Sequence, residues 1–339
     1  MPRVSTLLLA LVLAACGART ELSVEPPARE DAGPPGPCSP MTPEPLPGPG
    51  ISARAVDGDR IWGTFTPGLN VGWVDARTGE RTTAAEDQLG VRSIVAEGGD
   101  AWWTQAGFSD FAGELVHAPG GRSPRAIDDG LFQPGGVQLG ARYVFYAEWT
   151  NSGSLRDEMR GRMLRIPRGG GDVTELATGL GLPTGTALTD RFLYWVDRRR
   201  NHVARVGRAG GEVEIVAADL GGVSSALAAH DGEVFFGVPT GREVEIRRFD
   251  ERIDAVDVVA TAPTEVRGLI AIEEGLLLSL WYGRDRIGEA LGFLPRDGAE
   301  VIELLPSGSS PAVGPRHVYW TATGEESRLV RLCRDALPR

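Results

Sequence analysis

Candidate catalytic side chains are few in this sequence and lie far apart. Histidine is the side chain best suited to proton transfer or metal binding near neutral pH, and the four histidines are His117, His202, His230 and His317. In the repeat described below, two fall on third strands, one in an inner turn and one on a second strand, so they cannot converge on one metal. No Ser–His–Asp or Cys–His arrangement stands out either. We therefore expect no catalytic residue, no metal and no cofactor.

Aromatic and arginine side chains gather near the loops that follow the second strand of several repeats. These residue types are enriched at the binding hot spots of protein interfaces. The candidate ligand-binding residues are Phe108, Phe111, Trp149, Arg198, Arg199, Arg200, Trp281, Tyr282 and Arg284. Arginine at these positions would suit an acidic or carboxylate-bearing partner, through charge-assisted and often bidentate hydrogen bonds. The alternative is that these segments are ordinary surface loops.

An internal repeat positions these side chains. A cluster of large apolar residues recurs along the chain, for example as "DRIWGTF", "DAWWTQA", "FLYWVD" and "RHVYWTA". One column of the aligned clusters contains Trp62, Trp103, Tyr146, Trp195, Phe236, Ser279 and Trp320. The successive spacings are 41, 43, 49, 41, 43 and 41 residues. A period just above forty, rich in aromatic and turn residues, predicts an all-β fold, a seven-bladed β-propeller of four-stranded blades.

Each unit follows the same plan, which the fourth unit illustrates. Its predicted strands are "TALT", "FLYWVD", "HVARVGR" and "EVEIVAA". Because a blade lies between two neighbours, its second strand should be apolar on both faces, and we expect Tyr194 and Trp195 to pack between blades. In a propeller, the loops joining second to third strands, and fourth strands to the next blade, surround one mouth of the central channel. The candidate binding residues of different blades should therefore share one face.

Four glycine-containing segments resemble phosphate-binding loops when each is read alone. They are "APGGRS", "PRGGGD", "RAGGEV" and "PRDGAE". Each falls between the third and fourth strands of its unit, where a tight hairpin needs positive φ. None follows a strand and opens a helix, as nucleotide-binding loops do. We interpret all four as turns.

The clusters "HVYWTATG" and "FLYWVD" resemble the YWTD-type repeats and the bacterial lipoprotein propellers that share a "VYWTD…V.R…GG" unit. The resemblance covers about residues 51–339 and implies the propeller fold, but it brings no catalytic residue with it. Ser279 departs from the aromatic column. Lactonase-type propellers hold a divalent cation with Glu, Asn and Asp, and asparagine is rare here. The streptogramin-lyase type needs closely spaced histidines, which this sequence lacks.

Two acid pairs fall in predicted turns between first and second strands. They are Asp57 with Asp59, and Glu273 with Glu274. We expect these carboxylates to be solvated, and calcium binding there is the alternative.

The first residues predict export and a lipid anchor. Arg3 precedes an apolar stretch, Leu7 to Ala15, that is too short to span a membrane. The following "LAAC" resembles the lipobox of bacterial lipoproteins, which implies cleavage after residue 15 and acylation of Cys16, palmitate included. An ordinary secretory signal is the alternative. Gly17, rather than Asp, follows the cysteine, which favours the outer over the inner membrane.

Residues 16–50 are predicted to be a tether that begins at the lipidated cysteine. Proline recurs every few residues and large apolar side chains are almost absent, which is typical of extended or disordered linkers. A proline-rich partner-binding motif is the alternative. The formal net charge of −11 argues against a nucleic-acid-binding surface.

The seventh unit supplies three predicted strands instead of four. A missing outer strand would leave the ring open with an exposed edge, so we expect the segment just before Ile51 to complete the blade. With Cys16 lipidated, Cys38 and Cys333 remain in an exported, oxidising context. Cys333 falls on the third strand of the incomplete unit, so we predict a Cys38–Cys333 disulfide that holds the N-terminal segment beside it. Two unpaired thiols are the alternative.

These inferences combine into one functional hypothesis. The sequence favours a monomeric, membrane-anchored, extracytoplasmic propeller in the bacterial cell envelope that binds a protein or peptide at its loop-rich mouth. The alternatives are a cell-envelope hydrolase or lyase with a metal-dependent site at that mouth, and a purely structural role in an envelope assembly.

Overall fold

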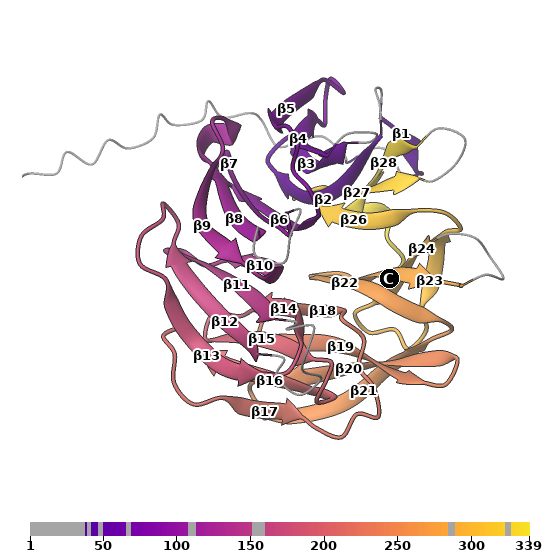
Figure 1. Ribbon diagram of the computed structural model, residues 1–339. Coiled ribbons are helices and arrows are strands. Elements are labelled where there is room, and N and C mark those ends of the chain that lie inside the picture. The colour runs from indigo at the N-terminus through magenta and orange to yellow at the C-terminus, as the bar shows by residue number, and fades with distance from the viewer. Residues whose placement is uncertain are drawn as a thin grey trace, which may run out of the picture. The chain divides into compact units, whose positions relative to one another are not determined.

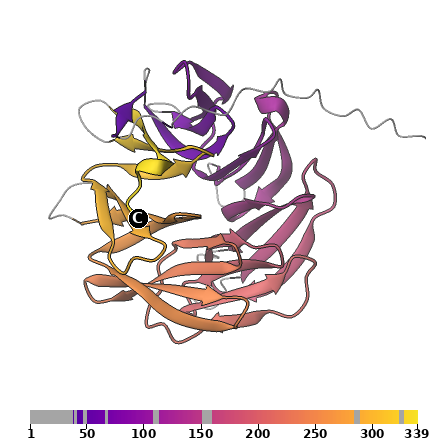
Figure 2. The ribbon, with the colours of Figure 1, turned by 180° about the vertical axis from the view of Figure 1, so that it is seen from behind.

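The predicted propeller is present in the structure. The computed structural model describes residues 38, 42–46, 50–65, 69–107, 113–150, 160–283, 289–322 and 327–339. Within Cys38–Arg339, these residues form seven antiparallel sheets of four strands each. The sheets are arranged around one axis, with the innermost strand of each sheet next to it (Figure 1 and Figure 2). The all-β, seven-bladed prediction is therefore confirmed.

Blades one to four use consecutive strands, ordered from the axis outward. Blade one contains β2 (Ile51–Asp57), β3 (Arg60–Phe65), β4 (Asn70–Asp75) and β5 (Arg81–Ala85). Blade two contains β6 (Val91–Glu97), β7 (Asp100–Gln105), β8 (Gly113–Ala118) and β9 (Arg125–Leu131). Blade three contains β10 (Gln133–Leu139), β11 (Tyr143–Thr150), β12 (Arg160–Pro167) and β13 (Thr174–Leu180). Blade four contains β14 (Pro183–Leu188), β15 (Phe192–Asp197), β16 (His202–Gly207) and β17 (Glu214–Ala217).

The remaining blades continue this order until the last one. Blade five contains β18 (Leu227–His230), β19 (Glu233–Thr240), β20 (Glu243–Asp250) and β21 (Ala255–Ala262). Blade six contains β22 (Glu265–Ile272), β23 (Gly275–Trp281), β24 (Glu289–Pro295) and β25 (Ile302–Leu305). Blade seven contains β26 (Ser309–Val313), β27 (His317–Ala322), β28 (Arg328–Cys333) and β1 (Glu44–Pro45).

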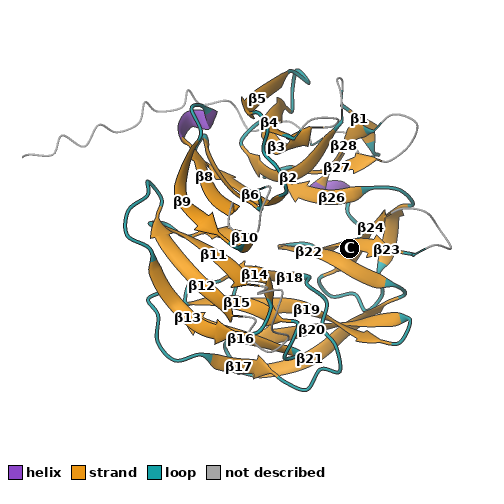
Figure 3. Cartoon of the chain, in the orientation of Figure 1, coloured by secondary structure: helices purple, strands orange, loops and turns teal. Residues whose placement is uncertain are grey.

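Helix is a minor part of the described chain (Figure 3). It consists there of two short 3-10 segments, η1 (Pro119–Gly121) and η2 (Arg334–Ala336). Neither they nor any other described segment forms an apolar helix long enough to cross a membrane.

The ring closes between the two ends of the described chain. Strand β1 pairs antiparallel with β28, with Glu44 opposite Arg331. The Leu46 N–H continues the ladder by donating to the Leu329 carbonyl at 2.8 Å. The Arg331 guanidinium also donates to the Glu44 carboxylate at 2.9 Å. A segment before Ile51 thus supplies the outer strand that the seventh unit lacks, as expected.

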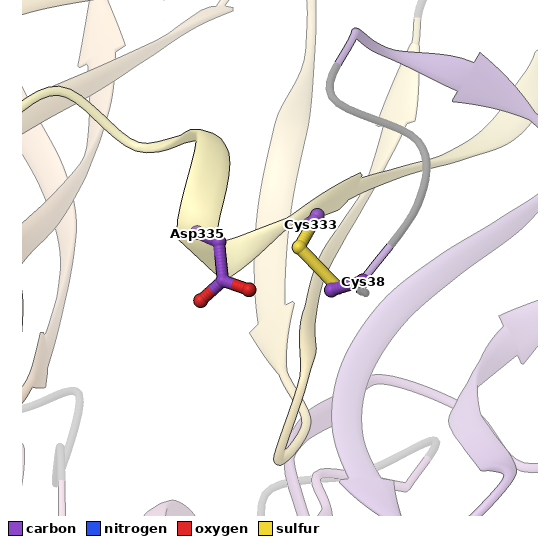
Figure 4. A group of neighbouring side chains, drawn as sticks. All are labelled: Cys38, Cys333 and Asp335. Atoms are coloured by element: carbon purple, nitrogen blue, oxygen red, sulfur yellow. A yellow bond between two sulfur atoms is a disulfide. The ribbon is translucent and has the colours of Figure 1, made fainter. Parts of the chain in front are cut away.

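Cys38 and Cys333 lie beside this junction. Their sulfur atoms are at disulfide distance and their Cα atoms are 5.8 Å apart (Figure 4). Cys333 is fully buried at the end of β28. The pair therefore links the start of the described chain to the third strand of blade seven.

The aromatic clusters form the contacts between blades. Tyr194 and Trp195 are both fully buried, but they face opposite neighbours. Tyr194 packs in a cluster with Phe249 of blade five, whereas Trp195 packs in a cluster with Phe145 of blade three. Alternate side chains of one second strand thus cover two neighbouring blades. The expected interblade packing is confirmed.

The predicted turns are mostly where the sequence placed them, but two of the acids expected to be solvated are not. Glu274 accepts two hydrogen bonds from the Arg334 guanidinium, one of them at 3.0 Å. Gly210 and Gly211 have positive φ values of 96° and 126° in the hairpin before β17. Asp57, expected to be solvated, instead accepts hydrogen bonds from the backbone N–H groups of Gly98 at 3.1 Å and Gly99 at 2.5 Å in the next blade. This carboxylate therefore ties blade one to blade two.

Replacing Cys38 by serine should lower the stability of the propeller. The pair spans 295 residues of sequence, and removing a disulfide typically lowers the free energy of unfolding by about 2–4 kcal/mol. Guanidinium chloride unfolding would measure the difference, with reduced wild-type protein as the matched control. Non-reducing peptide mass mapping should recover the peptides of Cys38 and Cys333 joined. Free thiols at both positions in native protein would contradict the pairing.

Candidate functional site

The described candidate binding residues lie at one face of the propeller. Trp149 and Trp281 are near or at the ends of second strands, and Arg198 to Arg200 follow the second strand of blade four. Tyr282 follows Trp281 directly. All of these positions belong to the connections between second and third strands, which share one end of the blades. Phe108, Phe111 and Arg284 lie outside the described residues.

A buried carboxylate shapes the arginine loop of blade four. Asp197 is fully buried at the end of β15. Its two oxygens accept backbone N–H groups of Gly181 at 2.8 Å, Leu182 at 3.0 Å, Arg199 at 3.2 Å and Arg200 at 3.1 Å. The loop is therefore a tightly fixed turn, and Asp197 serves its backbone rather than a ligand.

The side chains of this face point in different directions. The Arg200 guanidinium donates to the Gly179 carbonyl at 2.7 Å, so it lies against the outer strand of blade three. The Tyr282 hydroxyl donates to the Glu303 carboxylate at 2.9 Å, on the outer strand of blade six. Trp281 instead stacks against the innermost strand of its blade. These contacts direct Arg200 and Tyr282 toward the rim of the face.

Three other arginines lie close to the axis, and the sequence reading did not single them out. Each lies at a register shift between the innermost and second strands of its blade, where one residue of the innermost strand has no pairing partner. These unpaired residues are Arg54 in β2, Arg92 in β6 and Arg267 in β22. A β-bulge leaves its extra residue unpaired and re-aims its side chain. We call Arg54, Arg92 and Arg267 the channel arginines.

The channel arginines line one cavity of about 340 Å³. Its wall comes from blades six, seven, one and two, whose innermost strands β22, β26, β2 and β6 follow one another around the axis (Figure 1). Ser93, Ser279, Glu289 and Pro311 also contribute to the wall. We call this space the arginine cavity. It combines guanidinium and hydroxyl donors in one hollow.

Positive charge exceeds negative charge in the arginine cavity. Among the described residues, Arg54 has no hydrogen-bond or ion-pair partner, and Arg92 donates only to the Gln133 side chain, at 3.2 Å. Arg267 forms ion pairs with Glu265 at 3.2 Å and Glu289 at 3.8 Å. The surrounding protein desolvates Arg54 and lowers its pKa, while Glu289 raises it to a smaller extent. Because arginine stays protonated in proteins, Arg54 is a cation without a direct counter-ion.

Arg267 connects the arginine cavity to one of the predicted residues. Its guanidinium carbon lies 3.9 Å from the centroid of the Trp281 ring, a cation–π contact. Trp281 therefore contacts a residue of the cavity wall without itself lining the cavity. Trp281 is thus a predicted binding residue that contacts a channel arginine.

The other side of the axis lacks such side chains at the corresponding bulges. In β14 the residue skipped by the register shift is Gly185. A Cβ atom at this position would lie 1.9 Å from the Ser225 carbonyl oxygen of blade five. Close packing of innermost strands thus excludes a side chain there. Among the described innermost strands, arginine is the skipped residue in β2, β6 and β22 only.

A sequence signal for the channel arginines does exist, although it is weak. Each sits inside an otherwise small or apolar first strand, in "ISARAVD", "VRSIVAE" and "EVRGLIAI". A single charged side chain in a strand next to the axis can reach water only through the channel. The signal becomes specific only when three repeats are compared together.

One group of side chains in the described residues has the spacing of metal ligands. The one set of potential ligand atoms within 4.8 Å of one another is Cys38, Cys333 and Asp335 (Figure 4). Its two sulfur atoms are bonded to each other. In the described part of the chain, the carboxylates and histidines do not gather elsewhere in this way.

Comparisons with known proteins agree with the fold. No family model matches this chain, and no curated protein matches it. A streptogramin B lyase structure is 13% identical with a TM-score of 0.63, over 85% of this chain and 96% of that one. A puromycin hydrolase is 16% identical with a TM-score of 0.65, over 84% of this chain and 52% of that one. An oligogalacturonate lyase from Vibrio parahaemolyticus is 10% identical with a TM-score of 0.59, over 86% and 91%. At these identities the likeness shows the fold alone.

Replacing Asp197 by alanine should destabilise the protein, whereas replacing Arg198 should not. The first change leaves four backbone N–H groups without their acceptor, and each unsatisfied buried group costs about 1–3 kcal/mol. We expect the free energy of unfolding to fall by at least about 2 kcal/mol. The exposed Arg198→Ala control should stay within about 0.5 kcal/mol of wild type. Urea unfolding would measure both, and equal losses would contradict the assigned role of Asp197.

Proposed function

We propose that this chain is a membrane-anchored, extracytoplasmic binding module that holds an acidic protein or peptide at the mouth containing the arginine cavity. One observation carries the proposal. Three arginines line one cavity, and among the described residues only Arg267 of the three forms ion pairs with carboxylates. An anionic group entering this cavity would gain charge-assisted hydrogen bonds, which are about twice as strong as neutral ones.

The chemistry of the wall favours binding over catalysis. Among the described residues that line the arginine cavity, Glu289 is the one carboxylate, and none is a histidine. A catalytic zinc site, for comparison, uses three protein ligands. The named lyases and the hydrolase resemble this chain at 10–16% identity, so their activities are not transferred to it. A donor-rich, acceptor-poor cavity supports recognition of an anion.

The position of Cys38 supports an accessible mouth. Cys333, its partner, is opposite His317 at one end of the β27–β28 pair. The other end of this pair, Ala322 opposite Arg328, leads into the loop class that surrounds the mouth. Cys38, which is bonded to Cys333, therefore lies at the end of blade seven that is away from this mouth.

Replacing Arg54 or Arg92 by alanine should weaken binding of an acidic peptide. The probe is fluorescein-labelled hexaglutamate, measured by fluorescence anisotropy at 50 and 150 mM salt. We expect at least a tenfold loss, because each change removes a cation that has no carboxylate partner among the described residues. Arg77→Ala is the matched control: it makes the same change in net charge at an exposed ion pair with Asp59. Failure of wild type to bind, or equal losses in all three variants, would overturn the proposal.

Replacing Cys16 by alanine tests the anchor separately. Without the sulfur, the lipobox cysteine cannot be acylated, and a bacterial host should accumulate unprocessed, unlipidated protein. Fractionation of the host and labelling with a palmitate analogue would measure retention and acylation. Cys38→Ala should keep both. Membrane retention of the Cys16→Ala protein at the wild-type level would contradict the lipid anchor.

A further inference from the structure

Blade six differs from the other blades at the aromatic column of the repeat. The column residues of the other blades are large aromatics, each fully buried: Trp62, Trp103, Tyr146, Trp195, Phe236 and Trp320. Blade six has Ser279 there instead, opposite Gly268 on the innermost strand. A Cβ atom on Gly268 would lie 3.2 Å from the Ser279 hydroxyl oxygen, so the two residues are already close. Small residues thus replace the bulk that fills the equivalent space elsewhere.

Both small residues line the arginine cavity. The loss of the aromatic side chain therefore has a definite consequence, which is a hollow that reaches into blade six beside Arg267. Leu269 and Ile270, neighbours of Gly268 on β22, contribute apolar surface to the same wall. The arginine cavity consequently has a guanidinium-lined side toward the axis and a recess within blade six.

The Ser279 hydroxyl is an unpaired polar group in this recess. The residue is only 6% exposed, and its side chain forms no hydrogen bond with any residue that the structure describes. The Ser279 oxygen is not among the buried side-chain atoms that lack a partner, and Ser279 lines the arginine cavity, so its hydroxyl can donate into that cavity. An acceptor supplied from the cavity would satisfy it. The hydroxyl thus adds a neutral hydrogen-bond donor to the charged donors of the channel arginines.

We infer that the arginine cavity takes a single compact oxyanion group, a carboxylate or a phosphate, which accepts a hydrogen bond from the Ser279 hydroxyl and lies against Arg54 and Arg267. The inference rests on the proposed function and specifies which chemical group of the ligand the mouth recognises. Glu289, 3.8 Å from Arg267, would repel a second anionic group placed beside the first. One acidic side chain or chain end inserts, and the rest of the ligand stays at the mouth.

The size of the arginine cavity agrees with this assignment. Its volume of about 340 Å³ is at the lower end of the range for small-molecule pockets, about 300–1,000 Å³. One acidic residue fits such a space, and a folded partner does not. The specificity of binding would therefore come from one inserted group, with additional contacts provided by the surrounding loops.

Two small probes distinguish the sources of the oxyanion. N-acetylglutamate carries carboxylates, and N-acetyl-O-phosphoserine carries a phosphate on a residue of similar size. Isothermal titration calorimetry would measure each against wild type, Ser279→Ala, Ser279→Thr and Arg54→Ala. We expect Ser279→Ala to bind the preferred probe about tenfold more weakly, since it loses the hydroxyl donor and keeps the space. Ser279→Thr, which retains a hydroxyl, should recover part of the affinity.

Ser93→Ala is the matched control, because it removes a hydroxyl from the same cavity without touching the recess. It should bind like wild type. Thermal unfolding should find Ser279→Ala at least as stable as wild type, which separates lost binding from lost folding. If Arg54→Ala loses affinity while Ser279→Ala does not, the proposed function stands and the role of Ser279 is wrong. If wild type binds hexaglutamate but neither small probe, insertion of a single oxyanion is wrong.

Discussion

Packing between blades is the interaction on which the rest of this structure depends. Each blade buries large side chains on both of its faces, as Tyr194 and Trp195 do from one strand. A blade with one face uncovered would expose that surface to water, so every blade needs two neighbours. This requirement extends around the ring to its ends, where β1 must pair with β28. The core between the first and last blades therefore forms only when the ring is closed.

The same packing determines where a ligand can be held. Innermost strands approach so closely that Gly185 has no room for a side chain. Elsewhere around the axis, register shifts at Arg54, Arg92 and Arg267 place long side chains at the wall of the arginine cavity. The arginine cavity therefore results from irregularities in an otherwise regular repeat. Ser279 is another such irregularity. It puts a small side chain in place of an aromatic one in blade six, which contributes the most residues to the cavity wall.

The sequence predicted those features that depend on a repeated pattern. The aromatic column, the four-strand units and the strand contributed by the segment before Ile51 all follow from period and from the need to close a ring. The channel arginines do not, because regular alternation along a strand would place Arg54 toward a neighbouring blade. Only the pairing of β2 with β3 reveals that Arg54 is skipped. Likewise, Arg200 and Tyr282 take their directions from Gly179 and Glu303, partners that are distant in sequence and cannot be identified from a loop alone.

The covalent link at Cys38 also decides how a pulling force would enter the fold. Strand β1 has two residues and would peel easily from β28 if tension arrived along its own chain. Because Cys38 precedes β1 and is bonded to Cys333, tension from the N-terminal side passes into β28 instead. Strand β28 is six residues long and is paired along its length with β27. By the same route, a protease cut between Cys38 and Ile51 would leave the propeller covalently attached to everything that precedes it.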